Sequence, residues 1–501
     1  MSNAMEPVVP DVAPTGIEGL DKLLLGGLPR HHMYLLQGEA GTGKTTVGMQ
    51  FLIEGVRAGE TSLFIALAET REDLLEVAAS HGWSLESIDI YEVTTAEAAE
   101  RLSGTQTIFP TSEVELSEVT DEIIEKLQET RPQRVIFDAV SELRLLADSP
   151  VRYRRQILAL RDALAQIQAT ALLTDTAVKD EEDRVLDSLV HGIIRLERWA
   201  PDYGGARRRL EITKLRGARY HEGWHDMSIT TGGVEVYPRP RRVGEAEHAD
   251  WQQLASGVPE IDALTGGGLE MGTATLIVGS SGTGKSSLAS LYVHAALDKG
   301  LKGAIFVFDE RVETLYKRSE DIGILLRPFV ANGQLTLDAV ETGSISPGQF
   351  ADTIRRLVEE EGVSIILLDS LTGYLRAMPE ETLLVHQMHD LLNYLSQKGV
   401  LSLLVVTNHG LIGDIVQQDL DLSYISDTVM LIRHFEAGGT LRKALSVVKK
   451  RHGWHEKAIR ELVIRDGGVD VGEPLHGFRG VLTGNPEFRG DQDDLMNGET
   501  G

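Results

Sequence analysis

Short apolar runs alternate with amphipathic stretches along the whole chain. Four runs in the first half are typical of β-strands: Tyr34–Leu36, Ser62–Leu67, Arg134–Phe137 and Ala171–Leu173. Between them, stretches such as Arg71–Ala79 and Val151–Gln166 have the apolar spacing of helices. Continuous apolar strands separated by helices predict an α/β fold, with a mainly parallel, twisted sheet flanked by helices on both faces. Ligands of such sheets bind beyond the carboxyl ends of the strands.

The chain contains an internal repeat. Pro14–Thr46 aligns without gaps to Ala255–Ser287, and Gly16, Asp21 and Lys44 meet Gly257, Asp262 and Lys285 at a constant offset. We therefore predict two tandem domains from one duplicated unit. The expected organisation is a first domain at 11–240, a linker at 241–254, a second domain at 255–484 and an acidic, disordered tail at 485–501.

Composition narrows the classes of function. The net charge of −27 disfavours a surface that coats nucleic acid, because neutralising phosphates requires clustered Lys and Arg. No apolar run approaches the roughly 18 residues of a membrane span, and we expect no signal peptide, because the first residues lack its apolar stretch. With no cysteine, disulfides and thiol catalysis are excluded. We expect a cytoplasmic protein that binds neither nucleic acid nor membrane.

Each repeat carries a glycine-rich P-loop after an apolar strand and before a helical stretch. Such loops wrap phosphates with backbone N–H groups, and the helix N-terminus adds a favourable dipole. We expect Lys44 and Lys285 to reach the β- and γ-phosphates of ATP and to act in catalysis. The candidate ATP-binding residues are Gly38, Gly41, Thr42, Gly43, Lys44, Thr45 and Thr46 in the first copy, and Gly279, Gly282, Thr283, Gly284, Lys285, Ser286 and Ser287 in the second.

Acidic residues follow further buried strands in both halves. The runs "RVIFD" and "SIILLD" end at Asp138 and Asp369, where a P-loop enzyme holds its metal shell. With the hydroxyls of Thr45 and Ser286, these acids form the candidate Mg²⁺ sites. A further carboxylate must orient or deprotonate the nucleophile, and the strand after each P-loop helix offers Glu69 in the first half, and Asp309 and Glu310 in the second.

Two basic pairs complete the set of candidates. Lys214 with Arg216, and Lys449 with Arg451, stand two residues apart on predicted strands. Alternate strand residues share a face, so each pair makes a fork of two cations. Such a fork is suited to contact phosphate, either in its own domain or in the site of a neighbour.

These motifs together resemble the KaiC family of tandem RecA-superfamily ATPases, which includes an autokinase of the circadian clock. The resemblance rests on "TGIEGLDKLLLGGLPR", "GEAGTGKT", "FDAVSEL", "KLRG" and "RHGWHEKAIRELVI", and it extends from about Asp11 to about Pro486. It implies RecA-like domains in a homohexamer of two stacked rings, with both Lys-x-Arg pairs reaching the neighbouring subunit. It also implies slow ATP hydrolysis in the first domain and phosphoryl transfer onto hydroxyl groups in the second.

Two positions depart from the family pattern. KaiC has two consecutive glutamates at the strand end of each domain, but here the first half reads Ala68-Glu69 and the second Asp309-Glu310. In "DLSYISDTVMLI" the resemblance places Ser423 and Tyr424 at the acceptor positions. Ser423 is thus the expected phosphoacceptor, with Ser426 and Thr428 as second choices.

Three functions remain open at this point. The first is a KaiC-like ATPase with Ser autokinase activity, with KaiB-like or two-component signalling proteins as candidate partners. The second is a nucleotide-gated scaffold with little catalysis, which Ala68 and Tyr424 favour. The third is a RecA-type recombinase or helicase motor, which the acidic charge and the duplication disfavour.

Overall fold

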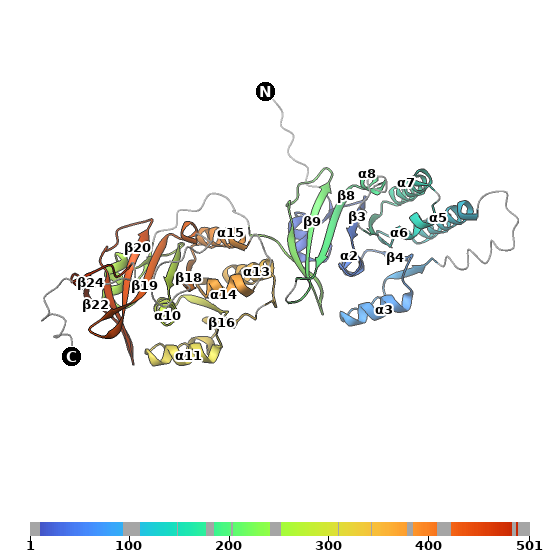
Figure 1. Cartoon of the computed structure of the whole chain (residues 1–501). Coiled ribbons are helices and arrows are strands. Elements are labelled where there is room, and N and C mark those ends of the chain that lie inside the picture. Colours follow the sequence, from blue (N-terminus) through green and yellow to red (C-terminus); the bar gives the residue numbers. More distant parts are fainter. Residues whose placement is uncertain are drawn as a thin grey trace, which may run out of the picture. The chain divides into compact units, whose positions relative to one another are not determined.

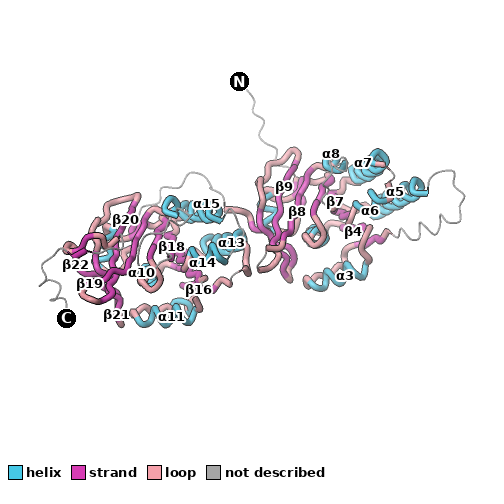
Figure 2. The backbone as a smooth tube through the Cα atoms, in the orientation of Figure 1, coloured by secondary structure: helices cyan, strands magenta, loops and turns pink. Residues whose placement is uncertain are grey.

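The structure is a computed structural model of the chain. It describes residues 11–93, 111–147, 149–176, 185–201, 204–240, 252–308, 310–341, 343–377, 384–407, 422–482 and 487–488. The chain divides into two compact units between Arg239 and Pro240. In each unit, helices cover both faces of a central sheet (Figures 1 and 2).

The first unit contains a nine-stranded sheet of order β11-β10-β9-β8-β3-β7-β6-β4-β5. Its strands are β3 (Met33–Gly38), β4 (Ser62–Ala66), β5 (Asp89–Glu92), β6 (Arg134–Asp138), β7 (Thr170–Asp175), β8 (Gly192–Trp199), β9 (Arg207–Leu215), β10 (His225–Thr230) and β11 (Gly233–Tyr237). Its helices are α1 (Glu18–Leu23), α2 (Lys44–Arg57), α3 (Arg71–Ser80), α5 (Thr111–Thr130), α6 (Ser141–Leu145), α7 (Pro150–Gln166) and α8 (Val185–Leu189). A two-stranded ribbon pairs β1 (Val12–Ala13) with β2 (Leu28–Pro29).

The second unit repeats this sheet in the order β16-β15-β17-β18-β14-β19-β20-β21-β22. Its strands are β14 (Ala274–Gly279), β15 (Lys302–Val307), β16 (Leu335–Ala339), β17 (Val363–Asp369), β18 (Leu401–Thr407), β19 (Thr428–Ala437), β20 (Thr440–Lys450), β21 (Arg460–Arg465) and β22 (Gly468–Pro474). Its helices are α9 (Pro259–Thr265), α10 (Lys285–Asp298), α11 (Val312–Asp321), α12 (Arg327–Ala331), α13 (Pro347–Glu359), α14 (Leu371–Ala377) and α15 (Leu384–Gln397). Short ribbons pair β12 (Gln253–Leu254) with β13 (Leu269–Glu270), and β23 (Phe478–Arg479) with β24 (Glu487–Phe488).

Strand direction divides each sheet into two parts. In the first unit β8, β3, β7, β6, β4 and β5 run parallel, whereas β9, β10 and β11 extend the sheet in antiparallel fashion from β8. The second unit has the same division, with β19 as the last parallel strand and β20 to β22 antiparallel. The predicted α/β fold, with two tandem RecA-like domains, is confirmed.

The core of each unit lies on both faces of its sheet. In β3, Tyr34 and Leu36 join the cluster under α1 and α2, whereas Met33 and Leu35 join the cluster under α5 and α7. Side chains of a strand alternate between faces, so one apolar strand contributes to two helical layers. This explains why the strands read as continuous apolar runs in the sequence.

A charged triad with a fully buried arginine lies in the first unit. Arg134, with an exposed fraction of 0%, pairs with Glu60, and Glu60 also pairs with Arg30 at 2.6 Å. Arg134 further donates to the carbonyl of Phe51 on α2, at 2.9 Å, and to the carbonyl of Pro14. Burial alone would raise the pKa of Glu60, but the two guanidinium groups hold it below its ordinary value. The triad thus ties the lead-in segment, α2 and β6 together.

The second unit has apolar residues at the three matching positions. Met271, Leu301 and Ile365 stand where the first unit has Arg30, Glu60 and Arg134, and all three pack in the cluster under α10. A buried ion pair and a well-packed apolar group are often close in stability. The same backbone therefore accommodates either the charged triad or three apolar side chains at these positions.

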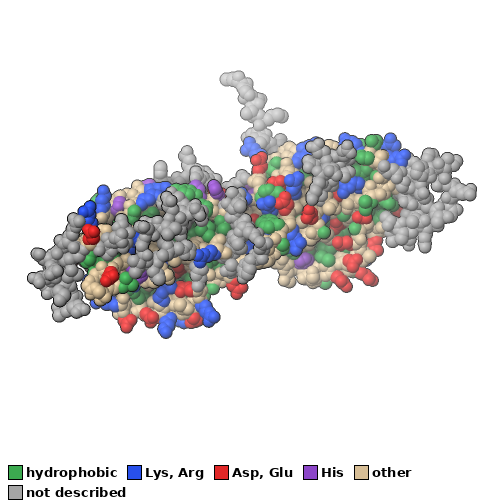
Figure 3. Space-filling model, in the orientation of Figure 1, with side chains coloured by type: hydrophobic (Ala, Val, Ile, Leu, Met, Phe, Trp, Pro, Cys, Tyr) green, Lys and Arg blue, Asp and Glu red, His purple; other side chains and the backbone are tan. Residues whose placement is uncertain are grey.

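No helix in the described residues is long and apolar enough to cross a membrane. On the face shown in Figure 3, Lys and Arg side chains are interspersed with Asp and Glu side chains over both units.

We predict that Arg134→Ala lowers the free energy of unfolding of the first unit by about 3–5 kcal/mol, because it removes a fully buried side chain together with its hydrogen bonds to the carbonyls of Phe51 and Pro14. Hydrogen-exchange mass spectrometry in increasing urea separates peptides of the first unit from those of the second. Arg161→Ala, at an exposed ion pair with Asp162, should change stability by less than about 0.5 kcal/mol. Equal effects of the two substitutions would contradict the role of the triad.

Candidate functional site

The loop between β3 and α2 has the geometry of a phosphate cradle. Gly43 is the N-cap of α2 and has φ 104°, and Gly41 has φ 73°. Residues with a Cβ rarely adopt these left-handed angles, so the two glycines allow the turn. A Cβ on Gly38 would lie 2.6 Å from the hydroxyl oxygen of Thr42, so this position also requires glycine. The loop therefore exposes backbone N–H groups at the start of a 14-residue helix.

The second unit forms the same loop between β14 and α10. Gly284 is the N-cap of α10 with φ 98°, and Gly282 has φ 78°. A Cβ on Gly279 would lie 2.4 Å from the carbonyl oxygen of Ile432 on the neighbouring strand. A cavity of about 380 Å³ lies beside this loop, and the residues that line it include Ser281, Gly282, Gly284, Lys285, Ser286, Ser287, Glu310, Arg318, Asp369 and Lys443.

The two P-loop lysines fold back over their loops. Lys44 Nζ donates to the carbonyl oxygens of Gly38 and Glu39 at 2.8 and 3.0 Å, and Lys285 Nζ donates to Ser280 at 2.8 Å. Burial lowers the pKa of Lys285 to about 8, against the opposing charge of Asp369. Burial also lowers the pKa of Lys44, where Asp138, Asp175 and Glu69 oppose it. An anion bound in either loop would favour the charged lysine.

Asp138 and Asp369 stand at equivalent strand ends beside the loops. The hydroxyl of Thr174 donates to Asp138 Oδ1, and among the described residues the buried Oδ2 has no hydrogen-bond partner. In the second unit Asp369 lines the cavity with Ser286. A carboxylate oxygen without a protein partner, near a hydroxyl at the start of the P-loop helix, suits the oxygen-rich shell of Mg²⁺. The first unit therefore fits a bound Mg²⁺ at Thr45 and Asp138. In the second unit Ser286 and Asp369 offer the same kinds of oxygen donor, but Asp369 Oδ2 also contacts Arg318 at 3.4 Å.

The carboxylates proposed to act on the nucleophile differ between the units. Glu69 lies just beyond β4 on the exposed rim, and partial burial and then the charge of Asp138 raise its pKa. Glu310, just beyond β15, contacts Arg318 at 2.7 Å. Asp309 lies outside the described residues.

The Lys-x-Arg pairs lie against their own units. Lys214 donates to the carbonyl of Val190 at 2.8 Å, and Arg216 donates to that of Ser188 at 3.3 Å. The second pair behaves alike: Lys449 donates to the carbonyl of Ser426, and Arg451 donates to that of Tyr424, both at 2.8 Å. Neither Lys449 nor Arg451 lines the cavity beside the second P-loop. Contact with a neighbouring subunit stays a prediction.

The acceptor segment begins with a 3-10 helix at Leu422–Ile425. The side chain of Ser423 lies outside the described part of the structure. Tyr424 is exposed and its ring lies near that of His389, whereas Ser426 and Thr428 are buried. Transfer to either buried hydroxyl would require the segment to open.

The sequence analysis missed several charged groups at these sites. Asp175 ends β7 and pairs with Arg144 on α6 at 3.2 Å. In the first unit Arg208 donates to the P-loop carbonyl of Gly41 at 3.1 Å, and in the second the matching strand position is Lys443. The strand-end position of Asp175 was a usable signal, because β7 lies beside β3. Arg208 and Lys443 could not be found in this way, because the sequence pattern does not fix the register of the hairpin that carries them. Arg144 depends on which face of α6 points toward β7, which the sequence pattern does not fix either.

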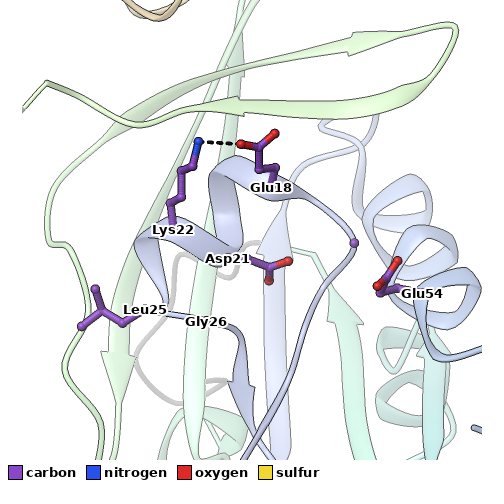
Figure 4. A pocket seen from close by; sticks show the side chains of 7 residues that line it. Glu18, Asp21, Lys22, Leu25, Gly26 and Glu54 are labelled. Atoms are coloured by element: carbon purple, nitrogen blue, oxygen red, sulfur yellow. Dashed lines mark hydrogen bonds and ion pairs between the residues drawn. The ribbon is translucent and has the colours of Figure 1, made fainter. Parts of the chain in front are cut away.

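A separate pocket of about 500 Å³ lies on the lead-in segment of the first unit (Figure 4), and the carboxyl groups of Asp21 and Glu54 face it. Asp21 accepts hydrogen bonds from Thr15 N and Oγ1 at 2.7 and 2.8 Å, and burial raises its pKa to about 6. In the second unit Asp262 accepts a hydrogen bond from Ser256 N at 2.6 Å. Because the same contact recurs in both units, we assign Asp21 a structural role in the lead-in segment rather than a role in ligand binding.

Comparison with known proteins places this geometry in a family. The family model described as "ATPase: KaiC" matches residues 13–241 and 254–476. The chain is 27% identical over 484 residues to the circadian clock oscillator protein KaiC of Synechococcus elongatus, covering 94% of this chain and 91% of that protein. It is 26% identical over 485 residues to KaiC of Prochlorococcus marinus, covering 94% and 95%. With both P-loops inside the matched residues, the chain belongs to the KaiC family of ATPases.

Proposed function

We propose that both units bind ATP at their P-loops, that the first unit hydrolyses it slowly and that the second transfers phosphate to Ser423. The observation that carries the proposal is the recurrence, in both units, of a glycine cradle, a folded-back lysine and a strand-end aspartate. An arrangement that both copies of the duplicated unit have kept favours a common chemistry.

Each residue has a definite task in this proposal. The loop N–H groups and the lysine of each unit hold the phosphates. Thr45 with Asp138, and Ser286 with Asp369, would hold Mg²⁺, which when bound would screen the charge on the phosphates. Glu69 orients the water in the first unit, and Asp309 with Glu310 accepts the proton of the hydroxyl in the second.

We further propose that the protein assembles into a homohexamer of two stacked rings. Family membership and the relatives that match over almost the whole chain support this assembly. The Lys214–Arg216 and Lys449–Arg451 pairs would leave their present carbonyl partners and reach the phosphates of the adjacent subunit. Partners of the KaiB-like or two-component type remain candidates.

A nucleotide-gated scaffold is the second candidate function. Ala68 leaves the first unit with one carboxylate at the strand end, and in the second unit Glu310 is already engaged by Arg318. Both features favour slow turnover.

We predict that Glu69→Gln, made in a Lys285→Ala chain, lowers the ATP hydrolysis rate by about 100-fold, which is typical for loss of a general base. Phosphate release under saturating Mg²⁺-ATP measures the rate. Glu72→Gln, on the exposed first turn of α3, should leave the rate within about twofold. An unchanged rate in Glu69→Gln would show that another group positions the water.

We predict phosphate on Ser423 after incubation with Mg²⁺-ATP, located by peptide mass spectrometry. It should disappear in Lys285→Ala and Ser423→Ala but persist in Lys44→Ala, because only the second cradle serves this acceptor. If the wild-type chain binds nucleotide but carries no phosphate on any peptide, the autokinase activity is excluded. An ATPase or a nucleotide-gated scaffold would then be the remaining functions.

We predict that ATP affinity at the second site falls as pH rises from 7 to 9.5. The free Lys285, with a pKa of about 8, loses its proton in this range, while bound phosphate holds the proton and raises the pKa. Affinity should therefore fall by up to about tenfold per pH unit above pH 8. Fluorescent-nucleotide titration of Lys44→Ala measures this. The ATP affinity of the first site, measured in Lys285→Ala, should begin to fall at a higher pH than that of the second site. Burial lowers the pKa of Lys44 as well, but three carboxylates near Lys44 oppose this effect.

A further inference from the structure

An arginine of α11 lies between two carboxylates of the second site. Arg318 Nη1 contacts Glu310 Oε2 at 2.7 Å, and Nη2 contacts Asp369 Oδ2 at 3.4 Å. The side chain lines the 380 Å³ cavity together with Lys285 and Ser286. One guanidinium thus connects the carboxylate proposed to act on the nucleophile with the carboxylate proposed to hold the metal.

The first unit has no cation at this position. Val77 on α3 stands where the second unit has Arg318, and it packs against the apolar cluster under α2. Around Lys44 lie three carboxylates, Asp138, Asp175 and Glu69. Arg144 neutralises Asp175 in part, but among the described residues neither Asp138 nor Glu69 forms an ion pair with an arginine. The first site therefore presents more uncompensated negative charge to an incoming polyphosphate than the second.

Arg318 keeps hydrogen-bonding capacity for a ligand. Its side chain is 30% exposed and lines the cavity, and among the described residues its Nε has no hydrogen-bond partner. A guanidinium presents five donors in a fixed fork and matches the oxygens of phosphate. The cavity also contains Lys443, so an anion entering it would meet cations from three elements, α10, α11 and β20.

We propose that Arg318 binds the terminal phosphate of the nucleotide at the second site and takes over part of the charge neutralisation that a divalent metal supplies. Nucleotide binding at the second site is then much less dependent on Mg²⁺ than binding at the first. This inference rests on the proposed function, because it assumes that the cavity is a nucleotide site. It adds a phosphate-binding residue on α11 and a difference in metal dependence between the two units.

The test measures nucleotide affinity with and without divalent metal at one site at a time. Lys44→Ala isolates the second site and Lys285→Ala isolates the first, and a fluorescent ATP analogue is titrated in Mg²⁺ or in EDTA. We expect removal of Mg²⁺ to weaken the second site by less than about fivefold and the first by at least about 50-fold. Adding Arg318→Val to Lys44→Ala should weaken nucleotide binding in EDTA by at least about tenfold, because charge-assisted hydrogen bonds are lost. The same substitution should change nucleotide binding in Mg²⁺ by less than about threefold.

Two further variants keep the result interpretable. Arg318→Lys retains the charge without the fork and should restore part of the metal-free affinity. Arg327→Val removes an arginine that pairs with Glu313 and Glu320 outside the cavity, and it should leave both affinities unchanged. The ratio of the affinities in Mg²⁺ and EDTA is taken within each protein, so a loss of folded molecules cancels.

The outcomes separate this inference from the proposed function. If Lys44→Ala binds no nucleotide in Mg²⁺, the second site is not a nucleotide site and the proposed function fails there. If it binds but Arg318→Val leaves the ratio unchanged, the nucleotide site stands and the role of Arg318 is overturned. A ratio that rises at least about tenfold in Arg318→Val, and not in Arg327→Val, supports it.

Discussion

Parallel pairing around the P-loop strand is the constraint on which both sites depend. Because β7, β6 and β4 run in the same direction as β3, their carboxyl ends meet at the edge where α2 begins. The second unit meets the same condition through β18, β17 and β15 around β14. Residues far apart in the chain, such as Lys44 and Asp138, thereby come within electrostatic range of each other. The glycine cradles can hold a phosphate only because this edge also supplies the charges around it.

The two units retain this framework while their charges diverge. Asp175 at the end of β7 is replaced by Val406 on β18, and Val77 is replaced by Arg318. The net effect is a more acidic surrounding for Lys44 and a more basic one for Lys285. A common sheet can thus support two phosphate-binding loops that differ in the charge around them.

The sequence predicted the α/β fold because its signals are local. Apolar runs of strand length, a ligand loop with glycines at left-handed positions, and a repeat in constant register need no tertiary information. It could not predict Arg318, because whether this side chain reaches Glu310 and Asp369 depends on how α11 packs on the sheet. Arg208 and Lys443 were missed for a similar reason: the register of an antiparallel hairpin decides which residue lies over the loop. The roles proposed for Ser423 and for the Lys-x-Arg pairs involve a neighbouring subunit, and a single chain holds no information on its placement.

The charged triad of Arg30, Glu60 and Arg134 constrains how the two halves diverged after duplication. The second half carries Met271, Leu301 and Ile365 at these positions, and each set is internally compatible. An intermediate that exchanged one member alone would bury an ionised group without its counterion or leave a gap in a close-packed core. The three positions are therefore epistatic: the effect of each substitution depends on the other two. A chimera that grafts β6 into the second half, or β17 into the first, would have to carry all three residues to keep its fold.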